Sequence, residues 1–255
     1  MVTTEMNQPT PLKATKSNYK DIYGLAQSVI NNMGGAHALL QRKDVSYELT
    51  QHHIATGKKD ISIEKYIFGE NYSSGDYYLH NWKVFPTIKD PIHQFSHEGE
   101  AHLIIKDKLI VNNIQLEETL QTRVDNLFEF SFPFQITDSK FILENMGKRK
   151  VNNISYNLIK LSFKPDYVPE NHSVFILYIN PRTHLIDQYL FSKPQEGLLE
   201  PRILVKLNYK ELNNIMFPVK REFYQADSKG NIISELVEVH SYSNLQFDNG
   251  FQLIN

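Results

Sequence analysis

The sequence predicts a mainly β (α+β) fold, in which one antiparallel sheet carries two helices. Segments rich in β-branched and aromatic residues, several with strict alternation of apolar and polar positions, fill most of the chain. Gly, Pro, Asn and Asp separate these segments, and only two further segments have apolar residues at helical spacing. The pattern indicates about ten or eleven strands. Because no composition shift marks a linker, we predict one domain over 18–255 after a flexible leader over 1–17.

The clearest pair of strands is the hairpin at 174–191, with the sequence VFILYINPRTHLIDQYLF. Its two apolar runs flank Asn180-Pro181-Arg182-Thr183. Proline presets φ at the second position of a type I turn, and asparagine suits the first because its side chain can bond the backbone ahead. We therefore expect two buried, paired strands at the packing centre of the sheet.

Composition excludes several classes of function. The chain of 255 residues contains no cysteine, which removes disulfides, thiolate metal sites and cysteine nucleophiles. The net charge of −2 gives no electrostatic argument for binding nucleic acid or an anionic membrane. No apolar run approaches the roughly 20 residues of a membrane span, and the start of the chain lacks the apolar core of a signal peptide. We expect a cytoplasmic protein if Met1 is the true start, and a periplasmic protein or membrane-anchored lipoprotein if a leader was removed.

The first helix is predicted from the N-cap Asn18 to Met33, and Gly34-Gly35 ends it. Its apolar residues share one face, so it should pack on a sheet. Strands are then expected at 45–50, 61–68 and 77–85. Before the third of them, the cluster Asn71–Asp76 has the composition of a turn.

Two prolines interrupt the following segment, so Pro86–Gly99 is expected to be a loop or an edge. A hairpin is predicted at 101–111. The second helix is predicted from apolar residues at helical spacing, namely Leu116, Leu120, Val124, Leu127 and Phe128. It runs into the aromatic segment Phe130–Phe134, where Pro133 ends the helix. From Phe141 onward the pattern predicts a meander of strands.

Several motifs together resemble a known family. They are Met33-Gly34-Gly35, Val45-Ser46-Tyr47, Phe132-Pro133-Phe134, Tyr178-Ile179-Asn180-Pro181-Arg182-Thr183 and the segment 207–218, LNYKELNNIMFP. Their order resembles that in the LolA/LolB-like superfamily of lipoprotein-localisation proteins. The likeness covers about 19–247 and is closest to a branch of unknown function, common as lipoproteins in Bacteroidetes-type bacteria.

The resemblance implies a half-barrel, a curved antiparallel sheet whose concave face is covered by the two helices. The best-known members of the superfamily carry lipoproteins across the periplasm or receive them at the outer membrane. The partner implied is therefore an apolar small molecule, a lipid or a lipoprotein, and we expect a monomer. The family usually has glycine where this chain has Asn214, and asparagine tolerates the same left-handed turn.

Histidines are the only candidates for catalytic or metal chemistry. His93, His97 and His102 cluster in one segment, but Pro91 and Gly99 argue against a helix that could align them. The spacing between His97 and His102 is also one residue too long for a zinc-protease pattern, and would put them on different faces of one helix or strand. We therefore predict no metal site and no cofactor, and keep these three histidines as the candidates. No nucleophile or phosphate-binding motif occurs, so no catalytic residue is assigned.

The candidate ligand-binding residues are aromatic. A pocket between helix and sheet could be lined by Trp82, Phe128, Phe130, Phe132, Phe134, Tyr178 and Tyr209. The alternative is that these side chains simply fill the core.

Three functions follow from these patterns. The first is a non-enzymatic binding or carrier protein with an apolar ligand in the half-barrel. The second is a metal-dependent hydrolase that uses the histidine cluster. The third is a structural or interaction module with a fully packed core, which would bind a partner through the sheet edge near Pro86–Gly99.

Overall fold

The structure is a computed structural model, and it describes residues 19–35, 38–39, 41–167, 173–194 and 197–253. The predicted leader and the predicted N-cap Asn18 lie outside these residues. None of the described helices is long and apolar enough to cross a membrane.

The described residues form two α-helices, three short 3₁₀-helices and thirteen strands. The helices are α1 (Tyr19–Asn32), α2 (Asn113–Ser131), η1 (Phe68–Glu70), η2 (Phe132–Phe134) and η3 (Pro165–Tyr167). The first six strands are β1 (Asp44–His53), β2 (Lys59–Ile67), β3 (Tyr72–His80), β4 (Ile92–His97), β5 (Glu100–Ile105) and β6 (Lys108–Ile110). The others are β7 (Phe141–Val151), β8 (Ile154–Phe163), β9 (Phe175–Ile179), β10 (Ile186–Lys193), β11 (Leu198–Leu212), β12 (Ile215–Ala226) and β13 (Ile232–Phe247).

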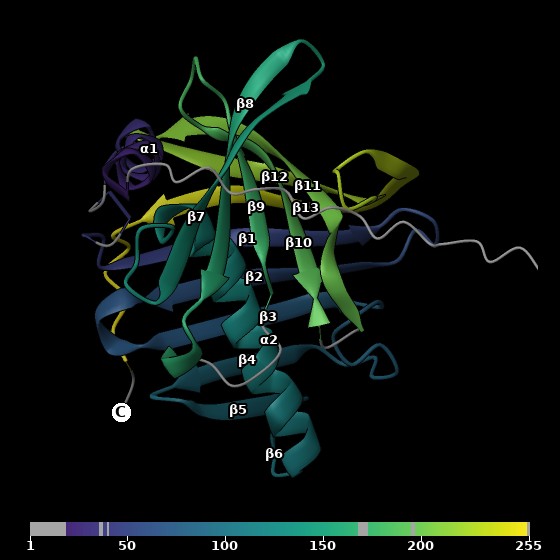
Figure 1. Cartoon of the computed structure of the whole chain (residues 1–255). Coiled ribbons are helices and arrows are strands. Elements are labelled where there is room, and N and C mark those ends of the chain that lie inside the picture. Colours follow the sequence, from purple (N-terminus) through teal and green to yellow (C-terminus); the bar gives the residue numbers. More distant parts are fainter. Residues whose placement is uncertain (1–18, 36–37, 40, 168–172, 195–196, 254–255) are drawn as a thin grey trace, which may run out of the picture.

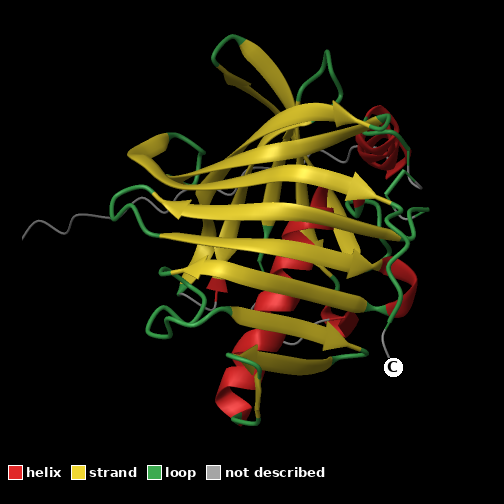
Figure 2. Cartoon of the chain, turned by 180° about the vertical axis from the view of Figure 1, so that it is seen from behind, coloured by secondary structure: helices red, strands yellow, loops and turns green. Residues whose placement is uncertain are grey.

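All thirteen strands form one antiparallel sheet in the order β6-β5-β4-β3-β2-β1-β13-β12-β11-β10-β9-β8-β7. The two ends of the meander meet where β1 pairs with β13, so the sheet has β6 and β7 as its edges. The sheet curls until β7–β10 face β1–β4, with α2 lying between them (Figures 1 and 2). The predicted half-barrel with a helix on its concave face is confirmed, with more strands than the ten or eleven expected.

Two of the predicted loops are strands. Asn71 of the predicted turn cluster is a turn residue with a φ of 47°, but Tyr72–Asp76 belong to β3. The small residues of this segment make room for a helix side chain: a Cβ on Gly75 would lie only 2.4 Å from Nη1 of Arg123 in α2. The segment at 92–97 is β4, an interior strand between β3 and β5. Pro91 precedes its first residue, where a missing N–H costs no ladder hydrogen bond.

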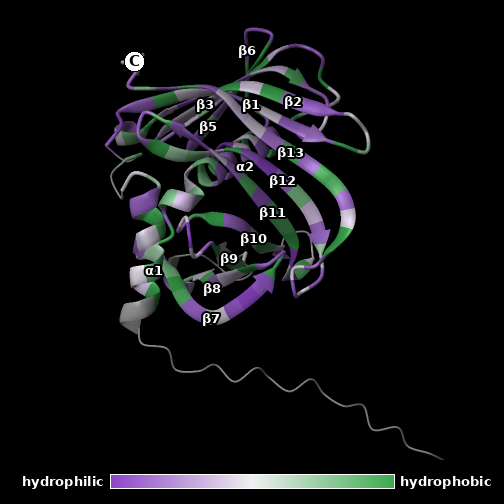
Figure 3. Cartoon of the chain, turned by 90° about the horizontal axis from the view of Figure 1, so that it is seen from above, coloured by the Kyte–Doolittle hydropathy of each residue, from purple (hydrophilic) through white to green (hydrophobic). Residues whose placement is uncertain are grey.

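Helix α1 covers the side of the half-barrel beside β7 (Figure 3). It ends as predicted, with Gly34 and Gly35 in the positive-φ region and the Gly35 N–H donating to the Ile30 carbonyl. The Met216 N–H donates to the Met33 carbonyl, which joins α1 to the turn at Asn213-Asn214. Asn214 has a φ of 63°, so the left-handed turn expected at this position is confirmed.

Helix α2 presents a polar face to the sheet, against the pattern of its apolar residues. Thr119, Arg123 and Asn126 are buried, whereas Val124 is 52% exposed. Arg123 donates to both carboxylate oxygens of Glu64 on β2, at 2.7 and 3.3 Å, and both side chains are 0% exposed. Tyr77 and Asn126 complete this group, which we call the sealed network.

Candidate functional site

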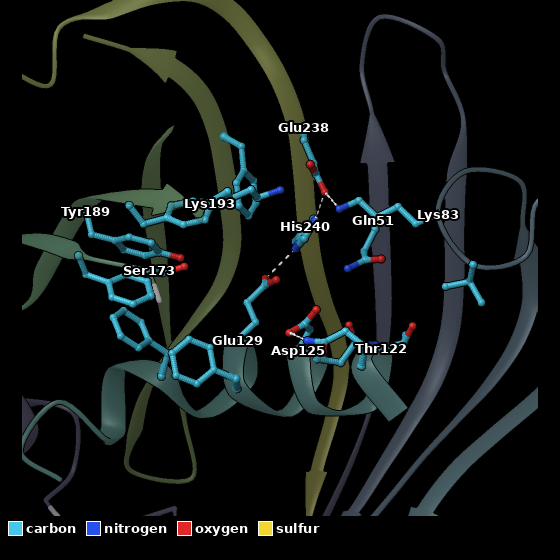
Figure 4. Close-up of a pocket in the computed structure, with 18 residues that line it drawn as sticks. Gln51, Lys83, Thr122, Asp125, Glu129, Ser173, Tyr189, Lys193, Glu238 and His240 are labelled. Atoms are coloured by element: carbon cyan, nitrogen blue, oxygen red, sulfur yellow. Dashed lines mark hydrogen bonds and ion pairs between the residues drawn. The ribbon is translucent and has the colours of Figure 1, made fainter. Parts of the chain in front are cut away.

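A partly open cavity of about 530 Å³ lies on the concave side of the sheet, beneath the C-terminal half of α2. Its wall has an aromatic end and a polar end. The aromatic end consists of Phe128, Phe132, Phe175, Tyr189, Phe191 and Phe223. The polar end includes Gln51, Lys83, Asp125, Glu129, Glu238 and His240 (Figure 4).

The aromatic end is built by α2 and η2 on one side and by β9, β10 and β12 on the other. Phe132 packs against Phe175 with ring centroids 4.6 Å apart and meets Tyr189 at 5.4 Å. Alternation along β9 and β10 turns Phe175, Tyr189 and Phe191 inward. These rings form a continuous apolar wall that leads from the core to the cavity.

The polar end rests on one row of residues that pair across five neighbouring strands. Their register places them side by side on the concave face, in the order Arg221, His240, Gln51, Asp60 and His80. All five side chains are buried. A whole row of buried polar groups in the middle of a sheet is unusual, because each one needs a partner to offset its desolvation.

His240 is the centre of a charged group that we call the open network. Its Nδ1 lies 2.7 Å from Oε1 of Glu129, and its Nε2 contacts Oε1 of Glu238. The same Glu129 oxygen accepts hydrogen bonds from Arg221 at 3.3 Å and from Tyr242 at 2.7 Å. The same Glu238 oxygen accepts one from Lys83. Arg221 also donates to the Glu129 carbonyl, which fixes this turn of α2 to β12.

These contacts shift the ionisation of the open network. Burial opposes the charge on His240, but the charges and hydrogen bonds of Glu129 and Glu238 outweigh it and raise the pKa of the imidazole. Burial likewise opposes the charge on Glu129, yet His240 and Arg221 hold its pKa far below the usual range. For Asp125, burial and the nearby Glu129 raise the pKa. The cavity therefore borders a histidine whose protonated form is stabilised by two carboxylates.

Asp60 positions Lys83 at the mouth of the cavity. Its carboxylate accepts three backbone hydrogen bonds, from the N–H groups of Trp82, Lys83 and Val84, at 2.7 to 3.0 Å. This clamp holds the loop after β3 against the sheet, and the Lys83 side chain reaches Glu238 across the cavity (Figure 4).

The predicted aromatic residues separate into three groups. Phe128 and Phe132 line the cavity, and Trp82 lies beside it, stacked on His53 and below Lys83. Phe130, Phe134 and Tyr209 pack in the main core instead; the Tyr209 hydroxyl donates to the Ile186 carbonyl. Tyr178 lies on the opposite face of β9 from Phe175, in a second cluster with Tyr156 and Leu190, where Arg149 donates to its hydroxyl. The structure thus places Tyr178 away from the concave wall.

The three candidate histidines lie on the outer face of the sheet. His93 and His97 flank Phe95 on β4, and His102 on β5 stacks on the same ring at 4.4 Å. The expectation that His97 and His102 face different sides is wrong, because the hairpin turn between β4 and β5 returns His102 to the same face. His93 bonds Asp76. Among the described residues, no group of three or more metal-binding side chains is arranged to hold an ion.

The charged residues of the cavity escaped the sequence analysis. In β13, Glu238, His240 and Tyr242 alternate with Val237 and Val239. A signal was present: titratable and hydroxyl-bearing residues at every second position of a long strand, an alternation that can mark a buried polar row as well as a solvated face.

Comparison with solved structures of known proteins supports the fold described above. No family model matches the sequence, and a search of curated proteins found no match. Among solved structures, a LolA superfamily protein from Nitrosomonas europaea is similar, with a TM-score of 0.50, 10% identity and coverage of 87% of this chain and 92% of that chain. A DUF1329 family protein from Desulfovibrio piger has a TM-score of 0.50 and 10% identity, over 91% of this chain and 95% of that chain.

A third similar structure is a domain from Vibrio parahaemolyticus assigned to outer membrane lipoprotein-sorting proteins. Its TM-score is 0.51 at 11% identity, over 92% of this chain and 95% of that chain. The Bacteroidetes-type branch stays a prediction. The order of the strands, the curvature of the sheet and these likenesses agree that this chain has the half-barrel fold of the LolA superfamily.

Proposed function

We propose that the protein is a non-enzymatic binding or carrier protein that holds the apolar chain of a lipid or of a lipidated protein in the cavity beneath α2. The observation that carries the proposal is the aromatic end of the cavity, where six large rings face a space that their own packing does not fill. Its volume lies within the range of about 300–1,000 Å³ that is usual for small-ligand sites.

The chemistry of the wall favours an alkyl chain. Each methylene group that leaves water contributes about 0.8 kcal/mol, so about ten buried methylenes would contribute about 8 kcal/mol. The loss of freedom on association reduces this gain, and we expect dissociation constants no tighter than micromolar for a single chain. The similar domain assigned to lipoprotein sorting supports a lipidated partner.

Native mass spectrometry of protein purified without detergent tests the proposal directly. We expect a co-purifying species with the mass of a lipid. The neutral fluorescent probe N-phenyl-1-naphthylamine provides an independent binding measurement, because its emission rises in an apolar site.

Two variants on α2 separate cavity binding from surface adsorption. Thr122 lines the cavity, and among the described residues its hydroxyl bonds only the Glu118 carbonyl of its own helix. Thr122→Trp therefore fills the space and should weaken probe binding at least about tenfold. Val124 lies on the same helix but outside the cavity, so Val124→Trp should bind like the wild type. Equal binding by the two variants, with no co-purifying lipid, would contradict the proposal.

A further inference from the structure

The polar row contains one side chain that has no partner and borders the cavity. Arg221 and His240 bond Glu129, and Asp60 accepts three backbone N–H groups. The Gln51 amide, by contrast, makes no hydrogen bond with any residue that the structure describes, although the residue is only 7% exposed. This amide is therefore available to a molecule that enters the cavity.

The location of Gln51 distinguishes it from the other unpaired polar groups. Five further residues in the described part of the chain have an unpaired, enclosed polar atom, and none of them lines the cavity. They are Ser73, His80, Gln94, Arg123 and Gln188. Gln51 lies between His240 on β13 and Asp60 on β2, and its amide is turned into the cavity beside Lys83 (Figure 4). Because an unpaired amide inside a protein is unfavourable, this position favours a ligand with a hydrogen-bonding group at the polar end.

The charges around the cavity balance, and each charged group has a partner. The three cationic side chains of the lining are Lys83, Lys193 and protonated His240, and its three carboxylates are Asp125, Glu129 and Glu238. Arg221 and Asp60 adjoin the cavity and add one charge of each sign. All of these groups already interact with other residues of the protein. A charged head group would have to break such an interaction or stay without a counter-ion in a partly buried site, and both are costly.

We propose that the cavity selects an uncharged amphiphile whose head group both donates and accepts a hydrogen bond, as in a fatty-acid amide or a monoacylglycerol, and that the Gln51 amide is the selecting contact. This inference rests on the proposed binding function and specifies its ligand class. A primary amide carries two donors and an acceptor, so Gln51 can pair with an amide ligand through two reciprocal hydrogen bonds. The alkyl chain of the ligand then lies against the aromatic end of the same cavity.

Displacement of N-phenyl-1-naphthylamine by chain-matched probes tests the head group. The probes are decanamide, N,N-dimethyldecanamide, decanoate and decyltrimethylammonium. The two amides share a carbonyl, but only decanamide has N–H donors, and the dimethyl form is the more apolar. A purely apolar site would therefore prefer the dimethyl form. We expect decanamide to bind at least about tenfold tighter than each of the other three. The hydroxyl and ester groups of 1-decanoylglycerol offer the same donor and acceptor, so it should bind within about tenfold of decanamide.

Two glutamine variants assign the contact. Gln51→Leu removes the unpaired amide at similar volume and should leave the midpoint of urea unfolding unchanged or higher. It should weaken decanamide binding about tenfold and the dimethyl form less, so that the preference for decanamide is lost. Gln188→Leu is the matched control, because Gln188 is also buried and has an unpaired amide nitrogen but does not line the cavity. It should leave the affinities of all the probes unchanged.

The outcomes separate the two proposals. If none of the probes binds, the binding function itself is wrong. If the dimethyl form binds as tightly as decanamide, or a charged probe binds tightest, the binding function stands and selection of an uncharged, hydrogen-bonding head group is overturned. If Gln51→Leu keeps the preference for decanamide, the amide serves the fold or an ordered water, and its role as the selecting contact is overturned.

Discussion

Helix α2 takes part in two ion networks that link it to the sheet, and the two networks differ in burial and in access to the cavity. In the sealed network, Arg123 meets Glu64 with both side chains 0% exposed, and Tyr77 and Asn126 add further hydrogen bonds. In the open network, Glu129 is 21% exposed and faces both His240 and a cavity of about 530 Å³.

This difference separates a structural role from a binding role. A ligand cannot reach the buried pair of Arg123 and Glu64, so the sealed network has a structural role. It holds α2 in one position over β2 and β3. The open network keeps the same helix attached at Arg221 but leaves its polar groups accessible from the cavity. Because the sealed network holds α2 against the sheet, the cavity beside the open network can stay incompletely filled while the helix remains in place.

The largest expected effect is on the sealed network. Replacing Arg123 with Met removes the buried cation that Glu64 pairs with and leaves its carboxylate with hydrogen bonds from Ser62, Tyr66 and Asn126. Because a buried charge without its counter-ion is costly, we expect the free energy of unfolding to fall by about 3–5 kcal/mol. Urea denaturation measures the loss. The double variant Glu64→Leu/Arg123→Met should recover most of it, because an uncharged pair needs no compensation. A loss below about 1 kcal/mol for the single variant would show that solvent reaches Glu64.

In the open network the same kind of change should cost less. His240→Gln removes hydrogen bonds to two carboxylates, and a bond to a charged group is worth about 1.5–3 kcal/mol. Arg221, Tyr242 and Lys83 still hold the two carboxylates, so we expect a total loss of about 1.5–3 kcal/mol rather than twice that value. If His240→Gln lowered the free energy of unfolding as much as Arg123→Met in the same denaturation assay, the proposed difference between the two networks would be wrong.

Gly75 provides a second test of the sealed network, because it lies directly against Arg123. The Cβ of Gly75→Ala would lie 2.4 Å from Nη1 of Arg123 and displace the guanidinium from Glu64, at an expected cost of about 1–3 kcal/mol. Gly69→Ala is the control, since a Cβ there meets no atom within 4 Å. In an Arg123→Met background the cost of Gly75→Ala should shrink, because the two residues share the contact. An unchanged cost would mean that Gly75 is needed for a different reason.

The smallest effect is a pH dependence of the open network alone. The pKa of His240 is raised in the folded state, so its contribution to stability is complete below the unfolded value of about 6.5 and is lost as pH rises through the folded pKa. The pKa of Glu129 is lowered, so its contribution is complete above about 4.3 and is lost as pH falls through the folded pKa.

Unfolding free energies measured from pH 5 to pH 9 test the sign for His240, because the Glu129 contribution is constant above about 4.3. The stability difference between the wild type and His240→Gln should be largest near pH 6 and shrink toward pH 9. The difference for Arg123→Met should stay more nearly constant, because arginine remains protonated throughout this range. If the difference in unfolding free energy between the wild type and His240→Gln does not change with pH, the proton expected on His240 must lie on another group of the open network.

Patterns of local chemistry predicted much of the fold. The hairpin at 174–191 forms β9 and β10, and the Asn180 side chain accepts from the Arg182 N–H, as expected for its turn. The predicted end of α1 and the left-handed turn at Asn214 are also confirmed. These features depend on interactions among residues close in sequence, so the sequence carries their signal directly.

The sequence patterns predicted the positions of helices and strands better than they predicted which face of each element is buried and which side chains pair. On β2, Asp60, Ser62 and Glu64 point into the half-barrel while the isoleucines between them face outward. On α2, the apolar stripe that predicts the helix includes the exposed Val124, whereas Arg123 is buried. Burial of a charge is stable only where another chain segment provides a partner, and a partner that lies 59 residues away, as Glu64 does from Arg123, leaves no local pattern.

Local patterns in the sequence are enough to predict an antiparallel meander with two helices, because periodicity, caps and turn residues act over a few positions. The sequence does not specify which face of each strand is concave, because both faces of β2 and β13 have plausible alternations; the tertiary structure specifies it. It also brought Gln51, Lys83, Glu129 and His240 together, by pairing β1 with β13 and laying α2 across them. The candidate site is therefore a product of long-range strand pairing, which no short segment of the chain specifies.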